Sequence, residues 1–147
     1  MTTQAHDTSA LAERLDFIGI DDAARNRLRS LQGVIAGSID AALDEFYAKV
    51  RVTPQTRHMF SDDRHLEGAK KRQERHWSII ASAEFDDRYV QGVSAVGQVH
   101  ARLGLEPRWY IGGYALILEQ LVGAVVAARW PSAFGRRHAA GLARDVS

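Results

Sequence analysis

The sequence predicts an all-α protein, and three observations indicate this fold class. Apolar residues recur at steps of three and four along most of the chain, the spacing that gives a helix one apolar face. The three prolines, at positions 54, 107 and 131, each fall where a helix boundary is expected. No segment alternates convincingly between apolar and polar residues, and no internal repeat is present.

The chain is expected to begin with loose residues, followed by a short helix from about Ser9 to Leu15. Gly19 is a break after this helix. Asp21 is a good N-cap for a second helix that begins near Asp22, because its carboxylate can accept a hydrogen bond from a free N–H group in the first turn.

A longer helical segment, Leu31–Val50, follows directly. One stripe of its apolar residues faces the expected core: Ile35, Ile39, Leu43, Phe46 and Val50. Thr53 and Pro54 then open another short helix, which is expected to end near Phe60.

Two further helices are predicted between residues 61 and 104. Ser61 or Asp62 caps the first, which is strongly charged over residues 65–75 and apolar after them. Asp86 begins the second, and Gly104 ends it as a helix-stop glycine. The second helix has one stripe at helical spacing: Tyr89, Val93, Val96, His100 and Leu103.

Pro107 starts a long apolar helix that reaches Arg129, and Pro131 restarts a last helix. In that last helix four residues are in register: Phe134, His138, Leu142 and Val146. The most apolar stretch, Tyr110–Ala128, includes polar residues such as Glu119 and shows helical sidedness. A buried core helix explains it better than a membrane span.

These elements add up to seven or eight helices in one domain, residues 21–147, with residues 1–20 as an N-terminal extension. The last helix stops about four turns after Pro131, and we expect it to be truncated. Helical patterning does not by itself choose between a globin, a four-helix bundle and a helical repeat fold.

Composition excludes several classes of function. Hydrophobic residues make up 46% and charged residues 25% of the chain, as in an average soluble protein. The formal charge of +1 gives no electrostatic argument for a nucleic-acid or membrane-surface partner. Without cysteine, disulfides, iron–sulfur clusters, thiolate-bound haem and cysteine-type zinc sites are excluded. The N-terminus has no signal-peptide pattern, so we expect a cytoplasmic protein without membrane insertion.

His100 is the first candidate for chemistry. It lies on the apolar stripe of its helix, between Val96 and Leu103. A lone histidine in such a place is more often a hydrogen-bonded core residue than a ligand. A neutral imidazole that faces an apolar slot is also what an iron porphyrin needs on its proximal side.

Residues 99–114 read VHARLGLEPRWYIGGY. This string resembles the proximal signature of globin-coupled sensors, a family related to protoglobins. Upstream, Phe46 and Tyr47 are similar to the Phe-Tyr pair of that family, and Thr53-Pro54 also matches. The similarity covers roughly residues 14 to 130, and it implies a globin-like helical sandwich around haem b.

The resemblance implies roles for several residues. His100 would be the iron ligand, Tyr47 the distal donor to bound oxygen, and Tyr110 a proximal residue beneath the haem. Tyr47 and Tyr110 have an ordinary alternative, since half-buried tyrosines often only pack. The expected apolar haem contacts are Val96, Phe60 and Leu103.

The charged helix offers candidates for the haem propionates. Arg72, Arg75 or His76 could serve, since anionic propionates favour cations at the pocket rim, although such a charged run is usually a solvated face. The sequence departs from its relatives here. Where a small polar residue often lines the distal pocket, the nearest equivalents are Ala69 and Arg72, which leaves the distal network beyond Tyr47 open.

The implied function is oxygen sensing at ferrous haem, with carbon monoxide or nitric oxide as other ligands. The chain would signal to an output module that it does not contain, such as a chemotaxis transducer, a histidine kinase or a diguanylate cyclase. It would form a homodimer through its last two helices and would not itself be an enzyme. The alternatives are a stand-alone globin in oxygen binding or nitric oxide detoxification, and a haem-free helical interaction domain.

Overall fold

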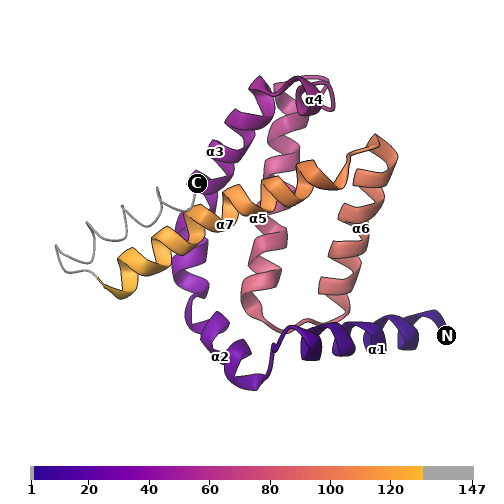
Figure 1. Cartoon of the computed structure of the whole chain (residues 1–147), viewed down its shortest axis with the longest axis vertical. Coiled ribbons are helices and arrows are strands. Elements are labelled where there is room, and N and C mark those ends of the chain that lie inside the picture. The colour runs from indigo at the N-terminus through magenta and orange to yellow at the C-terminus, as the bar shows by residue number, and fades with distance from the viewer. Residues whose placement is uncertain (1, 131–147) are drawn as a thin grey trace.

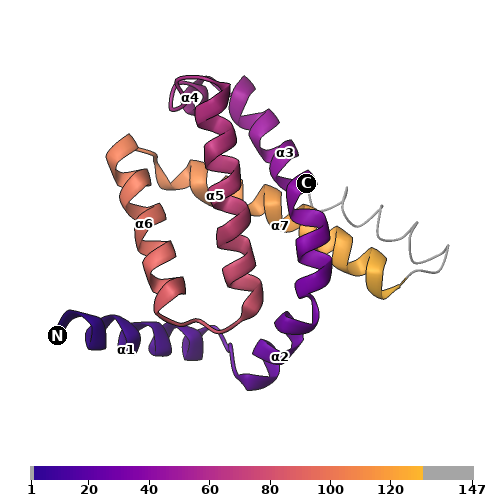
Figure 2. The ribbon, with the colours of Figure 1, turned by 180° about the vertical axis from the view of Figure 1, so that it is seen from behind.

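The computed structural model describes residues 2–130, and over this range the chain is entirely helical, as predicted. Figures 1 and 2 show the arrangement from two opposite sides. The seven helices are α1 (Thr2–Phe17), α2 (Asp22–Ser30), α3 (Gln32–Val52), α4 (Pro54–Arg57), α5 (Asp63–Ser82), α6 (Asp87–Leu103) and α7 (Pro107–Arg129).

Most helix boundaries lie within two residues of the predicted positions, but two helices differ in length. The first is not a short helix from Ser9, because α1 already begins at Thr2. The short helix opened by Pro54 ends at Arg57, and turns carry the chain on to Phe60. The expected last helix after Pro131 lies outside the described residues.

Aspartates fix the starts of three helices, as the sequence predicts for two of them and allows for the third. Asp21 accepts a hydrogen bond from the N–H of Ala24 (2.7 Å), and Asp62 accepts one from the N–H of His65 (2.7 Å). Asp86 accepts from the N–H groups of Arg88 and Tyr89 at the start of α6. At the other end of α6, Gly104 has φ +64°, which a glycine adopts without strain.

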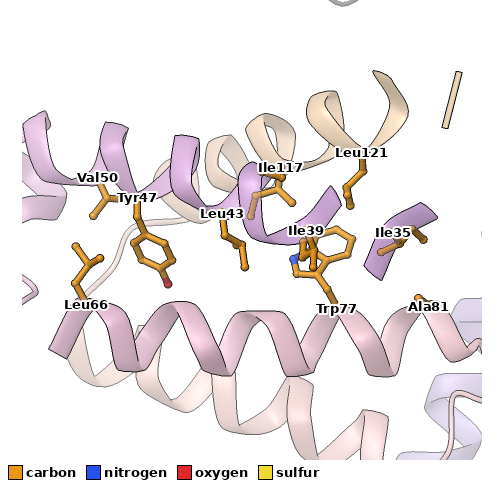
Figure 3. Close-up of a cluster of buried hydrophobic side chains, with 11 residues drawn as sticks. Ile35, Ile39, Leu43, Tyr47, Val50, Leu66, Trp77, Ala81, Ile117 and Leu121 are labelled. Carbon is orange, nitrogen blue, oxygen red and sulfur yellow. The ribbon is translucent and has the colours of Figure 1, made fainter. Parts of the chain in front are cut away.

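The hydrophobic core lies where α3 meets α5 on one side and α7 on the other. Figure 3 shows Leu43 and Ile39 of α3 between Trp77 of α5 and Ile117 of α7. Leu43 is fully buried. One charged group joins this interface, because Lys70 of α5 is buried and forms ion pairs with two aspartates of α3. The partners are Asp40 and Asp44, each 2.6 Å from the lysine Nζ.

Within residues 2–130, α7 alone has the length and apolar composition of a membrane span. Its inner face contributes Ile117 and Leu121 to the core. Gln120 of α7 also donates a hydrogen bond to Glu45 of α3 (2.7 Å). These contacts place one face of α7 in the core. Only 17% of the apolar window of α7 is buried, so the sequence's expectation of a buried core helix holds for that face and not for the whole helix.

The α3–α7 crossing depends on a glycine. A Cβ atom at Gly113 would lie 2.8 Å from Cε2 of Phe46, closer than real contacts allow. We therefore expect Gly113→Ala to lower the free energy of unfolding by about 1–3 kcal/mol, because the Phe46 ring or α7 must shift. Chemical denaturation measures the effect.

The neighbouring Gly112→Ala is the matched control for that variant. Gly112 is exposed and has open space around it. Its replacement should leave stability unchanged or raise it by up to about 1 kcal/mol, through helix propensity. Equal effects at the two positions would contradict the close approach of Phe46.

Helix α6 stands apart from this core. It runs beside α5 and is connected to it by a short turn, while α1 lies across the shared end of the two helices (Figures 1 and 2). Although α6 is amphipathic, none of its residues is buried within the described part of the chain. Val93 and Leu103 of its apolar stripe are each at least 40% exposed, so the apolar face of α6 lacks a full partner.

Candidate functional site

A cavity of about 410 Å³ lies against α6 and the start of α7. It is open to solvent, and its volume falls within the range of small-molecule pockets. Apolar side chains, one histidine and two tyrosines line it: Val93, Val96, Gly97, His100, Ala101, Leu105, Pro107, Tyr110 and Tyr114. The structure thus places His100, Val96 and Tyr110 together, as the sequence analysis expected of the haem pocket. Leu103 is not among the lining residues, and its side chain is 43% exposed.

His100 reaches the cavity from the last turn of α6. The ring of Tyr110, in the first turn of α7, is stacked on the imidazole with 5.3 Å between ring centroids and 16° between planes. Partial burial lowers the pKa of His100 below its ordinary value. The imidazole is therefore neutral near pH 7, the form in which a ring nitrogen can bind a metal.

Tyr47 lies on the other side of the fold, on the face of α3 that meets α5. Its side chain is only 5% exposed, and its hydroxyl points toward α5 in Figure 3. Within residues 10–130 this hydroxyl makes no hydrogen bond. Burial raises the pKa of Tyr47 to about 12, so the phenol keeps its proton and remains a donor.

Aromatic rings fix the position of Tyr47. Phe46 and Phe60 both meet its ring edge to face, with centroid distances of 4.8 Å and 6.0 Å. Phe60 follows α4, so the turn after that short helix supplies one wall of the Tyr47 environment. The structure brings Phe60 to Tyr47, whereas it does not line the cavity beside His100.

The two cationic candidates of α5 have different surroundings. Arg72 is exposed. His76 is buried, with its ring stacked on that of Tyr89 of α6 at 6.5 Å, and its Nδ1 is buried without a hydrogen-bond partner among the described residues. Burial lowers the pKa of His76. Arg75, the third candidate, is exposed.

The contact between His76 and α6 is at Gly92, where a Cβ atom would lie 3.4 Å from the imidazole Nδ1. Gly92 precedes His100 by eight residues, or about 12 Å along a helix that rises 1.5 Å per residue. His76 therefore lies well to one side of His100, toward the α1 end of α6, and cannot share a metal with it.

Several lining residues were not among the sequence candidates. Gly97 precedes His100 by three residues, so helical spacing alone could have identified it. Leu105 and Pro107 follow the turn at Gly104. Their position beside His100 depends on how that turn folds back, which periodicity does not encode.

The residues present fit a haem group. An apolar cavity beside a neutral histidine suits the proximal side of a porphyrin. The apolar stripe of α6 has no full cover within the described chain, and on the α3 side Tyr47 offers a hydroxyl that makes no hydrogen bond within residues 10–130. A group bound between α6 and the core would cover the exposed apolar face of α6 and give this hydroxyl an acceptor.

An all-helical fold with these features defines a globin-like protein. The sequence matches the Protoglobin family over residues 7–144, so the chain belongs to the protoglobin family. It is also 30% identical, over 128 residues, to the heme-based aerotactic transducer HemAT of Halobacterium salinarum. The match covers 84% of this chain and 26% of that transducer, so the chain spans about a quarter of its curated relative.

Proposed function

We propose that this chain binds haem b between α6 and the α3–α5 pair, and that it senses oxygen at the ferrous iron. The observation that carries the proposal is the cavity in which the neutral His100 lies among apolar side chains. Membership of the protoglobin family and similarity to a heme-based transducer support it.

In this proposal His100 is the proximal iron ligand, and the bound haem supplies a reduced metal that takes up oxygen reversibly. Tyr110 holds the imidazole orientation through its stacked ring. Tyr47, whose hydroxyl makes no hydrogen bond within residues 10–130, would donate one to the bound gas. Phe60 keeps the Tyr47 ring in place, Val96 contacts the porphyrin, and Leu103 is proposed to contact its edge.

The propionate edge of the haem is assigned to the α5 side of the pocket. His76 is the best-supported candidate for a propionate contact, because its Nδ1 is buried and lacks a hydrogen-bond partner in the described chain. Its position about 12 Å along α6 from His100 is one at which the rim of a porphyrin is expected, and not its iron.

As a sensor, the domain would pass the effect of gas binding to an output module such as a chemotaxis transducer, a histidine kinase or a diguanylate cyclase. The similarity to an aerotactic transducer supports an output of this class. A homodimer through the last two helices, in the cytoplasm, belongs to this proposal. Apolar residues exposed on α7 support that interface: Ile111, Leu118 and Val122.

The second candidate function is a stand-alone globin in oxygen binding or nitric oxide detoxification. Such turnover would need electrons from a separate reductase. Fast, sustained nitric oxide consumption in the presence of a reductase would favour this candidate over sensing.

An absorption spectrum tests the proposed function most directly. The purified protein, supplied with haem and reduced, should give a Soret band that shifts reversibly when oxygen is added and removed. A protein that stays colourless after addition of haem would contradict the proposal and favour a haem-free interaction domain.

A further inference from the structure

A second cavity, of about 460 Å³, lies at the corner formed by the end of α3, the short α4 and the start of α5. It is open to solvent and shares no lining residue with the cavity beside His100. We propose that this corner cavity binds a monocarboxylate with a short aliphatic chain, such as octanoate, and that Arg57 holds the carboxylate. Such binding does not require haem, so the inference goes beyond the proposed function.

The apolar part of the lining is the first argument. It consists of Val50, Phe60 and Leu66. Val50 and Leu66 belong to the core, and Figure 3 shows their side chains pointing toward each other from α3 and α5. An aliphatic chain in the cavity would leave water and lie against these side chains, and its affinity would rise with the apolar area that is covered. The volume of the cavity falls within the range of small-molecule pockets.

The charged part of the lining is the second argument. Two arginines and two aspartates complete the lining, and three of these four groups already have partners. Arg51 and Asp63 form an ion pair with 3.2 Å between Nη2 and Oδ1. Asp62 caps α5, where its carboxylate accepts a hydrogen bond from the N–H of His65. The side chain of Arg57 takes part in no ion pair or hydrogen bond within residues 10–130, so its guanidinium is available to an added carboxylate.

The backbone that carries Arg57 is fixed beside the apolar lining, which is the third argument. Thr53 and Pro54 start α4, and the N–H of Arg57 donates to the carbonyl of Thr53 (2.9 Å). The hydroxyl of Thr56 donates to the carbonyl of Val50 (3.0 Å) and so ties α4 to the end of α3. Arg57 is therefore held at the rim before a ligand arrives, which reduces the entropy lost on binding.

Phe60 connects the corner cavity with the proposed gas site. Its ring lines the cavity and also meets the ring of Tyr47 edge to face, with 6.0 Å between centroids. A ligand that packs against Phe60 would restrict the ring that holds Tyr47. We therefore expect an occupied cavity to slow the escape of oxygen, and this effect alone rests on the proposed function.

The test is a calorimetric titration of the haem-loaded protein with butyrate, hexanoate, octanoate and 1-octanol. The haem is reduced and saturated with carbon monoxide, so that a carboxylate cannot bind the iron. The variants are Arg57→Gln and, as the matched control, Arg27→Gln. Arg27 is an exposed arginine of α2, which lies at the other end of α3 from α4 (Figure 1). Both variants should fold like the wild type, since both side chains are exposed.

We expect affinity to rise about 2- to 4-fold for each methylene from butyrate to octanoate. Arg57→Gln should weaken octanoate binding about 5- to 10-fold and leave octanol binding unchanged, and Arg27→Gln should change either by less than about twofold. Octanol that binds as tightly as octanoate, or equal losses in the two variants, would overturn the role of Arg57. Absence of octanoate binding at millimolar concentrations would overturn the site itself.

Stopped-flow displacement tests the connection through Phe60. Saturating octanoate should slow the oxygen off-rate of the wild-type protein at least about twofold, with a smaller effect on Arg57→Gln at the same concentration. An unchanged off-rate with octanoate bound would refute this connection. A wild-type protein without a Soret band would instead overturn the proposed function, while the octanoate titration would still decide whether the corner cavity is a binding site.

Discussion

Replacement of His100 by alanine is expected to abolish stable iron ligation. The imidazole is the one histidine side chain among the cavity-lining residues, and within the described chain no group of three or more histidine, cysteine, aspartate or glutamate residues could hold a metal ion in its place. The Soret band of haem-loaded His100→Ala should be weak and broadened, and the haem should pass readily to an acceptor such as apomyoglobin. Absorbance and the rate of haem transfer measure both effects.

Two comparisons make the His100 result specific. His58→Ala removes an exposed histidine after α4 and should leave the spectrum unchanged. Added imidazole should partly restore the Soret band of His100→Ala, because the deleted side chain leaves room for it. A spectrum of His100→Ala identical to that of the wild type would show that another residue holds the iron.

Replacement of Tyr47 by phenylalanine should mainly speed the escape of oxygen. The Tyr47 hydroxyl makes no hydrogen bond within residues 10–130, so a gas with a partly negative outer atom gains its hydrogen bond at little cost to folding. A bond of about 1–3 kcal/mol corresponds to a roughly 5- to 100-fold faster off-rate. Carbon monoxide is less polar when bound, so its escape should change less. Stopped-flow displacement measures both rates.

The stability of Tyr47→Phe provides the internal control. Because the lost hydroxyl has no acceptor within residues 10–130, unfolding should be unchanged or slightly harder than in the wild type. An unchanged off-rate in Tyr47→Phe would refute the distal role.

Local signals in the sequence predicted most of the helices. The caps at Asp21 and Asp86, the stop at Gly104 and the start at Pro107 all lie where they were expected, because each acts through backbone groups within one turn. The length of the first helix was underestimated, because residues 2–8 carry no apolar stripe. The actual helix ends at Phe17, whose side chain is 89% exposed.

The candidate site was predictable in part, because residues at helical spacing lie on one face of a helix. Periodicity put His100 and Val96 on one face of one helix, and resemblance to a family supplied Tyr47 and Tyr110. Periodicity did not predict that Leu103 lies outside the cavity lining, nor that His76 is buried against Gly92. Those outcomes depend on which way α6 is turned relative to α5, and a single helix does not encode its rotation toward a neighbour.

The sequence by itself determined the class of fold, the helix boundaries set by caps and prolines, and the pairing of a histidine with an apolar stripe. Only the tertiary structure decided that Gly113 must admit Phe46 and that Lys70 is held by two aspartates. The first set depends on interactions between residues a few positions apart. The second depends on contacts across dozens of residues, which exist only once α3, α5, α6 and α7 have packed.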